Sequence, residues 1–313
     1  MGIGVVKALR LEFGQGLQIV GTDVIGLTPS FYIKDFLDAM YLVPRADKPE
    51  FTQRVLDICK KEAVNVLIPC TDHEVLPLSL KRAKFLEQGI RISVSPPETI
   101  RVCRDKWLTY LTLNKHLPMS KSALPDNLMD ALQFVGLPVV IKPRAGWGTR
   151  DIYIANTISE ARILVKKVAN PLLQECLSGE EYTVDCLANK DGKGLCVVPR
   201  KRIATRFGMS IRGVTVKDNE LIELGETLME SLKFVGLFNF QARKHNGKAT
   251  IFEINPRFAG TGILSVMAGV NLPALAVKDL CGMEMPTSFD FQDGLFITRY
   301  MEDCFVTKEM LVR

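Results

Sequence analysis

The sequence has little of what several protein classes require. It contains three histidines and eight cysteines in 313 residues, with no CxxC pair, which argues against a zinc site. No apolar run approaches the roughly 20 residues of a membrane-spanning helix, and the opening GIGVVKALR lacks the apolar stretch of a secretory signal. Low-complexity segments and tandem repeats are also absent. These absences favour a globular protein of the cytoplasm, with reduced cysteines that act as small apolar side chains.

The composition is that of an ordinary globular protein. Hydrophobic residues make up 47% of the chain, which is long enough for two or three domains. Its 40 basic and 35 acidic residues are mixed along the sequence and leave a net charge of +5. That balance suits an anionic small ligand as well as a nucleic acid, so charge alone does not choose a function.

The first part of the chain alternates short apolar runs with amphipathic segments. The segment 51–63 has its apolar residues at helical spacing and predicts a helix. Apolar runs predict three buried strands, at residues 17–23, 64–70 and 91–97. Strands and helices in this order are typical of a parallel α/β layer, and Pro96 and Pro97 mark its end. We therefore expect a first domain at residues 1–96.

The opening GIGVVKALR predicts a glycine turn that enters a helix. It is a weak match to the dinucleotide fingerprint, because Lys7 stands where the third glycine belongs and no strand precedes it. A dinucleotide-dependent oxidoreductase built on this layer remains an alternative function, although a disfavoured one.

From residue 97 the pattern changes to helices and antiparallel hairpins. Helices are predicted at residues 158–169 and 219–236. Strands are predicted at residues 137–143, 151–156, 171–179, 181–188, 195–202, 238–243 and 250–256. The last two strands would form a hairpin across His245, Asn246 and Gly247.

The stretch FEINPRFAG carries the first chemical signal. Glu253, Asn255 and Arg257 lie two residues apart, so on a strand they would project to one side. Glu and Asn offer the oxygen ligands that Mg²⁺ accepts, and Arg offers donors that match phosphate. The predicted hairpin would bring Gln241 to the same face. The alternative is an ordinary strand whose polar face is in solvent.

A second signal lies in VVIKPRAGWGTRD. Lys142 ends a predicted buried strand and precedes a loop with Gly146 and Gly148, where backbone N–H groups can approach phosphate oxygens. A lysine at a solvated strand end is the alternative. Phosphate binding is favoured because an oxygen-ligand set for Mg²⁺ occurs elsewhere in the chain.

The order of these motifs resembles the ATP-grasp superfamily, in the branch similar to the carbamoyl-phosphate-synthase large-subunit domains, which are carboxylate-amine ligases. The resemblance covers residues 104–282, and residues 1–96 take the place of the pre-grasp domain. It depends on RDKWLTY, VIKPRAGWG, QECLSGEEYTVD, Gln241 and EINPR in that order. Asp151 departs from the pattern, because the phosphate loop often has another glycine there.

The resemblance implies roles for residues of this chain. Lys106 and Lys142 would bind phosphates, and Arg257 would lie near the transferred phosphate. Glu181 would meet the ribose hydroxyls. The implied phosphate-loop and adenine contacts are Gly146, Trp147, Gly148, Gln174, Glu175, Cys176 and Leu177. The implied magnesium ligands are Gln241, Glu253 and Asn255.

Two polar segments remain open to several interpretations. The basic segment PRKRIATRFGMSIRG is either a solvated or nucleic-acid-binding loop or, as in the resembled family, a cover over the acceptor site. In the second case Arg202 and Arg212 would contact an anionic carboxylate or acyl-phosphate. In CTDHEVLP, Thr71 or Asp72 is expected to cap a helix, while the next two residues, His73 and Glu74, are candidates to line a substrate cleft.

The resemblance therefore implies an N-terminal parallel α/β pre-grasp domain (1–96), a two-lobed α+β ATP-grasp domain (97–285) with its site between the lobes, and a C-terminal tail (286–313). The expected ligands are ATP and Mg²⁺, with Mn²⁺ as an alternative metal. The expected activity is that of a ligase that joins small-molecule carboxylate and amine substrates, without nucleic acid or membrane. A homodimer is a further expectation. A non-catalytic ATP-binding regulatory module is the alternative.

Overall fold

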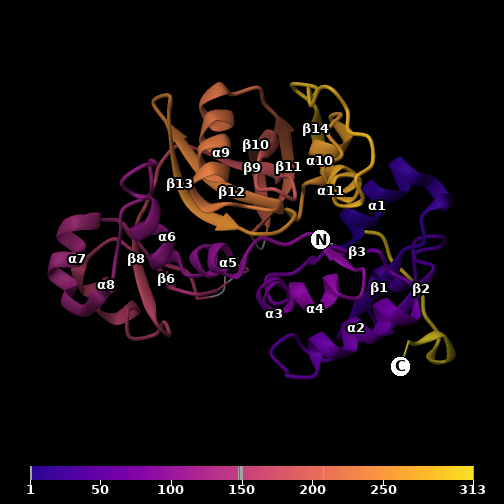
Figure 1. The fold of residues 1–313 in the computed structure, drawn as a ribbon. Coiled ribbons are helices and arrows are strands. Elements are labelled where there is room, and N and C mark those ends of the chain that lie inside the picture. Colours follow the sequence, from indigo (N-terminus) through magenta and orange to yellow (C-terminus); the bar gives the residue numbers. More distant parts are fainter. Residues whose placement is uncertain (1, 147, 149–150, 207, 313) are drawn as a thin grey trace.

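The computed structural model describes residues 2–146, 148, 151–206 and 208–312. We refer to residues 2–96 as the N-terminal unit, to residues 97–175 as the small lobe and to residues 176–285 as the large lobe (Figure 1). The mixed fold predicted from the sequence, an α/β unit before a two-lobed α+β region, is confirmed. None of the described helices is long and apolar enough to cross a membrane.

The N-terminal unit contains two pairs of short parallel strands, β1 with β2 and β3 with β4. The predicted helix at 51–63 is α2, whose apolar face lies in a core with Phe85, Ile92 and Ile100. The predicted strands are shorter than their apolar runs. The elements are α1 (Gly2–Phe13), β1 (Val20–Asp23), β2 (Ala39–Leu42), α2 (Phe51–Lys61), β3 (Val66–Leu67), α3 (Val75–Leu80), α4 (Arg82–Leu86) and β4 (Arg91–Ile92).

The opening segment is helical from Gly2 onward. Its helix α1 packs against α10 (Ile263–Met267) and α11 (Leu272–Cys281), which are the last helices of the large lobe. Asn271 supports this contact, because its side-chain amide donates to the carbonyl of Ala8 at 2.8 Å. The first and last helices of the described fold therefore share one apolar cluster.

The small lobe is a four-stranded antiparallel sheet in the order β5-β8-β6-β7. Helices α7 and α8 bury one face, in a core that includes Val139 and Ile141. Side chains alternate along a strand, so Lys142 belongs to the opposite face. The elements are α5 (Pro97–Arg104), α6 (Lys106–Leu113), β5 (Ser122–Ala123), α7 (Leu128–Val135), β6 (Val139–Pro143), β7 (Tyr153–Ala155), α8 (Ile158–Leu164) and β8 (Pro171–Glu175).

The large lobe is a six-stranded antiparallel sheet in the order β13-β12-β9-β10-β11-β14. Helix α9 covers one face, where Val184, Cys186 and Phe240 join its apolar residues. The elements are β9 (Glu180–Ala188), β10 (Gly194–Arg206), β11 (Met209–Thr215), α9 (Asn219–Leu232), β12 (Gly236–His245), β13 (Lys248–Asn255) and, from the tail, β14 (Phe296–Thr298).

The other face of this sheet changes character along β9. Leu187 packs in the apolar cluster with α1 and α11. Asp185 is buried two residues earlier, and Thr183 and Glu181 continue the same face because side chains alternate in a strand. We call this the polar face. The polar face is buried at Asp185, next to the apolar cluster of α1 and α11, and we call this its dry end. It becomes more exposed toward Glu181, whose side chain is 20% exposed.

The hairpin of β12 and β13 has the predicted position and a shorter turn. His245 pairs with Lys248, which leaves Asn246 and Gly247 as a two-residue turn with φ of 50° and 78°. The irregularity after Gln241 shifts the register by one residue, so that Gln241 lies opposite Glu253. The hairpin therefore brings these two side chains to one face.

The expectation that Arg257 continues this strand is wrong. Strand β13 ends at Asn255, and the backbone N–H of Arg257 donates to the carbonyl of Asn255 at 2.8 Å in a tight turn. Pro256 lies inside this turn and cannot donate a strand hydrogen bond. Arg257 still meets Asn255, but from a turn rather than from a strand.

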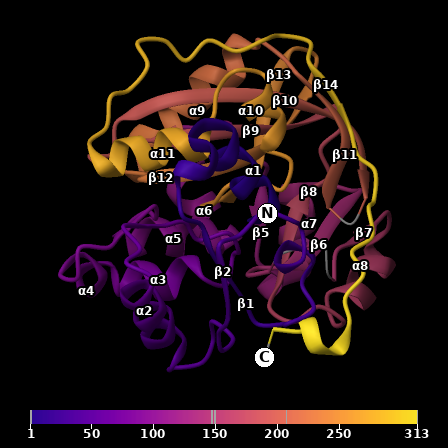
Figure 2. The same ribbon diagram turned by 90° about the vertical axis from the view of Figure 1, so that its right-hand side faces the viewer.

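The tail connects the large lobe with the N-terminal unit. Its strand β14 pairs with β11 at the edge of the six-stranded sheet. The chain then returns to the N-terminal unit, where the N–H of Val312 donates to the hydroxyl of Tyr32 at 3.3 Å (Figure 2).

The eight cysteines are free thiols in the structure. Burial raises the pKa of Cys59 to about 11 and that of Cys196 to about 12, so neither is a reactive thiolate. The exposed ones are Cys281 and Cys304, which differ from the expectation of burial.

Candidate functional site between the two lobes

Lys142 is the buried cation of the small lobe. Lys142 is only 4% exposed, and its ammonium lies 5.9 Å from the centre of the Phe252 ring on β13. Burial lowers its pKa to about 8, while the charge of Glu253 acts in the opposite direction. Lys142 therefore faces the large lobe and lies near the acid that the sequence analysis singled out.

Lys106 approaches the same region from helix α6. Asp105 caps this helix by accepting from the N–H groups of Trp107 and Leu108 and also forms an ion pair with Arg144 at 2.6 Å. The ammonium of Lys106 donates to the carbonyl of Gly146 at 2.9 Å. The helix start thus fixes Lys106 against the first residue of the glycine loop.

The glycine loop has the backbone geometry that its composition predicts. Gly148 has a φ of 72°, in the left-handed region that favours glycine. Asp151, where the resembled family often has a glycine, has a φ of 54°, also in the left-handed region. Trp147, expected as a nucleotide contact, lies outside the described residues.

The predicted adenine segment lies where the small lobe meets β13. Gln174 is buried and donates to the carbonyl of Phe252 at 3.4 Å. Glu175 uses its N–H for the carbonyl of Lys121 at 2.8 Å. Strand β8 ends at Glu175, so the next two residues, Cys176 and Leu177, follow it as half-buried parts of the connection to the large lobe.

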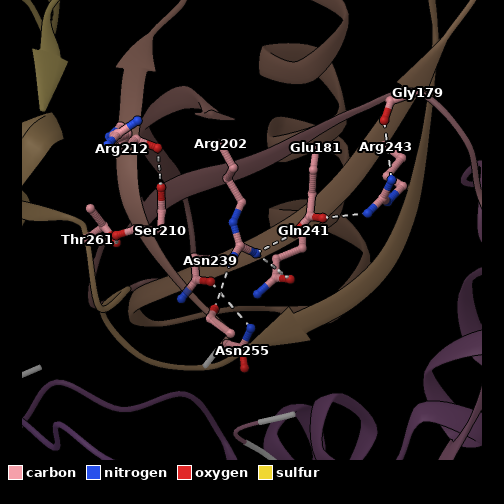
Figure 3. Close-up of polar contacts among 11 residues, drawn as sticks. Gly179, Glu181, Arg202, Ser210, Arg212, Asn239, Gln241, Arg243, Asn255 and Thr261 are labelled. Carbon is pink, nitrogen blue, oxygen red and sulfur yellow. Dashed lines mark hydrogen bonds and ion pairs between the residues drawn. The ribbon is translucent and has the colours of Figure 1, made fainter. Parts of the chain in front are cut away.

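Arg202 is the central cation of the polar face, with its side chain 5% exposed. It forms an ion pair with Glu181 at 2.6 Å and donates to the side-chain oxygen of Gln241 at 3.1 Å (Figure 3). Arg243 holds the other oxygen of Glu181 at 2.8 Å. The Nε of Arg202 is buried without a hydrogen-bond partner. This unsatisfied donor indicates a site that is incomplete without a further acceptor.

The predicted metal ligands share the polar face. Gln241 lies opposite Glu253, and Asn239 lies opposite Asn255. Glu253 lines a cavity between the lobes together with Lys106, and Gln241, which lies opposite Glu253, accepts from Arg202. Glu253 is therefore the acid between a cation of the small lobe and a cation of the large lobe.

The side-chain oxygens of the two amides already accept hydrogen bonds. Gln241 accepts from Arg202, and Asn255 accepts from Arg257 at 3.3 Å. Each of the two amide oxygens that would bind a metal ion thus already accepts from an arginine. An amide oxygen has two lone pairs, so the second one can still coordinate a metal. One carboxylate and two amide oxygens on adjacent strands fit Mg²⁺, which takes few protein ligands and keeps its other positions for water or phosphate.

Arg257 is held by the N-terminal unit. Its guanidinium forms a two-point contact with Asp72, with Nε at 2.9 Å from Oδ1 and Nη2 at 2.8 Å from Oδ2. The expected helix cap by Thr71 or Asp72 is wrong. Glu74 accepts from the N–H of Cys70 at 3.1 Å instead. The carboxylate of Glu74 therefore accepts from the backbone of this turn, whereas the carboxylate of Asp72 forms the ion pair with Arg257.

Arg212 does not join the residues of the polar face. Arg202 lies opposite Gly213 on β11, so the neighbouring Arg212 projects to the other side of the sheet, where it is exposed. Figure 3 shows it apart from Arg202 and Gln241. The two arginines therefore do not face one common volume, and their expected contact with an acceptor stays a prediction. The pairing of β10 with β11, which the sequence pattern does not reveal, places them on different faces.

An open cavity of about 410 Å³ lies beside Glu181 and Arg202. This volume is within the range of small-molecule sites. Lys201 and Arg243 also line it, together with the acid Glu180, so its wall carries charges of both signs. A cavity of about 10 Å³, lined by Lys106, Gln174 and Glu253 among others, lies between the lobes. The larger one has room for a ligand, whereas the smaller one has room for about one water molecule.

Comparison with known families decides how this arrangement is classified. Residues 167–303 match the family model described as ATP-grasp in the biosynthetic pathway with Ter operon. The chain contains an ATP-grasp domain. Residues 3–93 match the model of the PylC-like N-terminal domain, which precedes the ATP-grasp domain here. The resemblance stated from the sequence is confirmed.

Curated relatives are similar at low identity. The large chain of carbamoyl phosphate synthase from Deinococcus deserti is 23% identical over 293 residues, which cover 85% of this chain and 28% of the relative. D-alanine–D-alanine ligase from Petrotoga mobilis is 24% identical over 185 residues, covering 53% of this chain and 61% of the ligase. The chain thus spans less than two thirds of either relative.

Solved structures share the fold over most of the chain. The biotin carboxylase domain of 2-oxoglutarate carboxylase from Hydrogenobacter thermophilus, solved with MgADP, ADP and bicarbonate, has a TM-score of 0.73 at 16% identity. The alignment covers 94% of this chain and 71% of that domain. N5-carboxyaminoimidazole ribonucleotide synthetase from Thermotoga maritima has a TM-score of 0.68 at 19% identity, covering 92% of this chain and 75% of the synthetase.

Two residues of the site were not identified from the sequence. Asp72 lies 185 positions from Arg257, so no local pattern could connect them. Arg243 lies near the end of β12, close to the hairpin turn, where a solvated charge is common. The sequence did contain a signal for Arg243. It lies two residues after Gln241 in the same predicted strand, so the two side chains share a face.

Proposed function

We propose that this chain is an ATP- and Mg²⁺-dependent ligase that activates a small-molecule carboxylate for attack by an amine. The observation that carries the proposal is that Glu253 lines one cavity with Lys106 of the small lobe and lies opposite Gln241, which accepts from Arg202 of the large lobe. A carboxylate with amide oxygens beside it, between cations of two lobes, suits a metal bound to a polyphosphate. The names of the relatives, a synthase and a ligase, support the same reaction class.

The nucleotide would lie between the lobes and extend into the open cavity beside Glu181. Lys106 and Lys142 would neutralise phosphate oxygens, and the backbone of Cys176 and Leu177 would meet the adenine edge, because Glu175 already uses its N–H within the sheet. Glu181 would accept from the ribose hydroxyls. A carboxylate has about four acceptor sites, so it can accept from ribose while it contacts two arginines.

Gln241, Glu253 and Asn255 would hold Mg²⁺. When bound, the metal would reduce the charge repulsion between the phosphates and an incoming carboxylate. For Gln241 to turn its oxygen fully toward a metal, Arg202 would give up that hydrogen bond. Its guanidinium would then be available to the acceptor carboxylate, as its unsatisfied Nε suggests.

The reaction would need no side-chain nucleophile. A carboxylate oxygen of the substrate would attack the γ-phosphorus, and the bond to ADP would break. The amine nitrogen would then attack the acyl carbon, and phosphate would leave. Arg202 and Arg257 would stabilise the negative charge that moves during both steps. A reaction in which the protein mainly stabilises charge fits a site that contains several fixed cations.

An ADP-release screen tests the proposal. Purified protein would be incubated with ATP and Mg²⁺ and with carboxylates, amino acids or bicarbonate, and hydroxylamine would trap an acyl-phosphate as a hydroxamate. We expect carboxylate-dependent ADP release and a hydroxamate with at least one member of the panel. Nucleotide binding without ADP release across the panel would contradict the ligase and favour a regulatory module. The homodimer expected from the sequence stays a prediction, which light scattering would check.

A further inference from the structure

Arg257 is aimed by three groups from two parts of the fold. Asp72 of the N-terminal unit binds its Nε and Nη2 in a fork, at 2.9 and 2.8 Å. The carbonyl of Phe258 accepts from Nη1 at 3.1 Å, and Oδ1 of Asn255 accepts from Nη2 at 3.3 Å. The side chains of Arg257 and Asp72 are 13% and 15% exposed. This two-point geometry fixes the plane of the guanidinium, which a single contact would not do.

The amide of Asn255 depends on that guanidinium for its orientation. Its Oδ1 accepts from Arg257, and its Nδ2 donates to Oδ1 of Asn239 at 3.4 Å. Asn239 in turn donates to the backbone carbonyl of Arg257 at 2.8 Å. The three residues form a closed ring. The Arg257 donor distinguishes the oxygen end of the Asn255 amide from its nitrogen end.

We propose that Asp72 is a positioning residue that acts through Arg257 to keep the oxygen of Asn255 available to a divalent metal. The inference rests on the proposed function, in which Asn255 is a metal ligand. It assigns the N-terminal unit a part in the metal site, although none of the proposed metal ligands lies in that unit.

The physical reason is the cost of an unpaired, largely buried guanidinium. Without Asp72, Arg257 keeps two neutral acceptors and turns toward solvent or phosphate to recover its solvation. Asn255 then loses the donor that faces its oxygen, and its amide can rotate so that the NH₂ group faces the metal position. An NH₂ group repels a cation, so the metal loses a ligand.

The test measures ADP binding rather than turnover. Isothermal titration with ADP, once with Mg²⁺ and once with EDTA, separates the metal-dependent gain in affinity from nucleotide binding alone. In Asp72→Asn we expect this gain to fall about 10-fold or more, with the affinity in EDTA unchanged. Simple electrostatics predicts instead that ADP affinity in EDTA rises in this variant, because removal of an acid near the phosphates strengthens anion binding. A gain equal to or larger than that of the wild type overturns the inference.

Two further variants exclude a general structural effect. Asp72→Glu keeps the charge and should recover part of the metal-dependent gain that Asp72→Asn loses. Asp38→Asn removes the acid of another ion pair of the N-terminal unit, the one with Arg10 at 2.7 Å, whose arginine is also 13% exposed. It should leave the gain unchanged. Equal losses in Asp38→Asn and Asp72→Asn would overturn the inference.

The same titrations separate two kinds of failure. If the wild type binds ADP no more tightly with Mg²⁺ than with EDTA, the proposed function is wrong and the inference falls with it. If the wild type shows the gain and Asp72→Asn keeps it, only the role of Asp72 is wrong.

Discussion

The cations that the two lobes contribute to the candidate site are held in opposite ways. In the small lobe, Lys106 contacts a backbone carbonyl, and Lys142 is buried near an aromatic ring; neither forms an ion pair with a carboxylate in the described part of the chain. In the large lobe, Arg200 and Arg202 are each fixed by an acid, at 2.7 and 2.6 Å. The two lysines of the small lobe can therefore still bind an anionic ligand, whereas the two arginines of the large lobe are already paired with acids of the fold.

This difference separates stability from binding. A buried cation that has its acid in the fold is expensive to disturb, because removal of one partner leaves the other uncompensated. A buried cation without an acid costs the fold free energy and gains a partner only when an anion binds. Substitutions in the large lobe should therefore affect folding most, and those in the small lobe should affect nucleotide binding most.

The largest expected effect on stability is at the dry end of the polar face. Asp185 and Arg200 are 1% and 2% exposed, and Asp185 also accepts from the hydroxyl of Ser265. Asp185→Ala leaves the guanidinium without its acid and should lower the free energy of unfolding by about 3–5 kcal/mol. Chemical denaturation of the two proteins measures this. A decrease of less than about 1 kcal/mol in the free energy of unfolding would contradict the idea that the ion pairs of the large lobe mainly stabilise the fold.

Lys142→Ala should show the reverse profile. Loss of a preorganised charge at the phosphates should reduce ADP release by on the order of 10²-fold or more. The melting temperature should not fall, because no acid in the described fold loses a partner. Lys142→Arg is the matched control for charge. ADP release close to that of the wild type in Lys142→Ala would contradict the role of the small lobe.

The pH dependence should sharpen the comparison further. Lys142 has a pKa of about 8 in the fold because of burial, below its ordinary value of 10.5, so between these values the unfolded chain binds more protons than the folded one. Stability of the ligand-free protein should therefore rise with pH in this window, by up to about 1.4 kcal/mol per pH unit. ADP affinity should fall over the same window as the ammonium deprotonates.

The reference for the pH experiment is Lys142→Met, which lacks the titrating group. Its denaturation profile should be flatter than that of the wild type between pH 8 and 10. Parallel profiles for the two proteins would mean that Lys142 keeps an ordinary pKa.

The smallest effect is expected at Arg212. Because it is exposed on the other face of the sheet, Arg212→Ala should change the free energy of unfolding by no more than about 0.5 kcal/mol. Arg202→Ala should lower ADP release far more than Arg212→Ala does. A parallel assay of both variants checks this order, and equal losses would return Arg212 to the site.

The sequence predicted much of the architecture because its signals are local. Alternation located β9 and β12, helical spacing located α2 and α9, and the Asn-Gly turn fixed the hairpin. Gln241 and Glu253 could be placed on one face, because a short turn determines which residues are opposite. The mixed fold class followed from the same patterns.

The remaining features depend on contacts between distant segments or on irregular backbone. The pairing of β10 with β11 placed Arg212 on a different face from Arg202, and Pro256 ended β13 before Arg257. The ion pair of Asp72 with Arg257 requires the N-terminal unit to pack on the large lobe. Periodicity along the chain carries none of this information.

The most direct test of the central claim is the binding of Mn²⁺, as a spectroscopic substitute for Mg²⁺, in the presence of ADP. Electron paramagnetic resonance titration would compare the wild type with Glu253→Gln, which keeps the shape of the side chain and removes its charge. The account predicts that this variant loses at least about 10-fold in Mn²⁺ affinity while ADP affinity in EDTA stays the same. Equal Mn²⁺ affinity in the two proteins would show that Glu253 does not hold the metal.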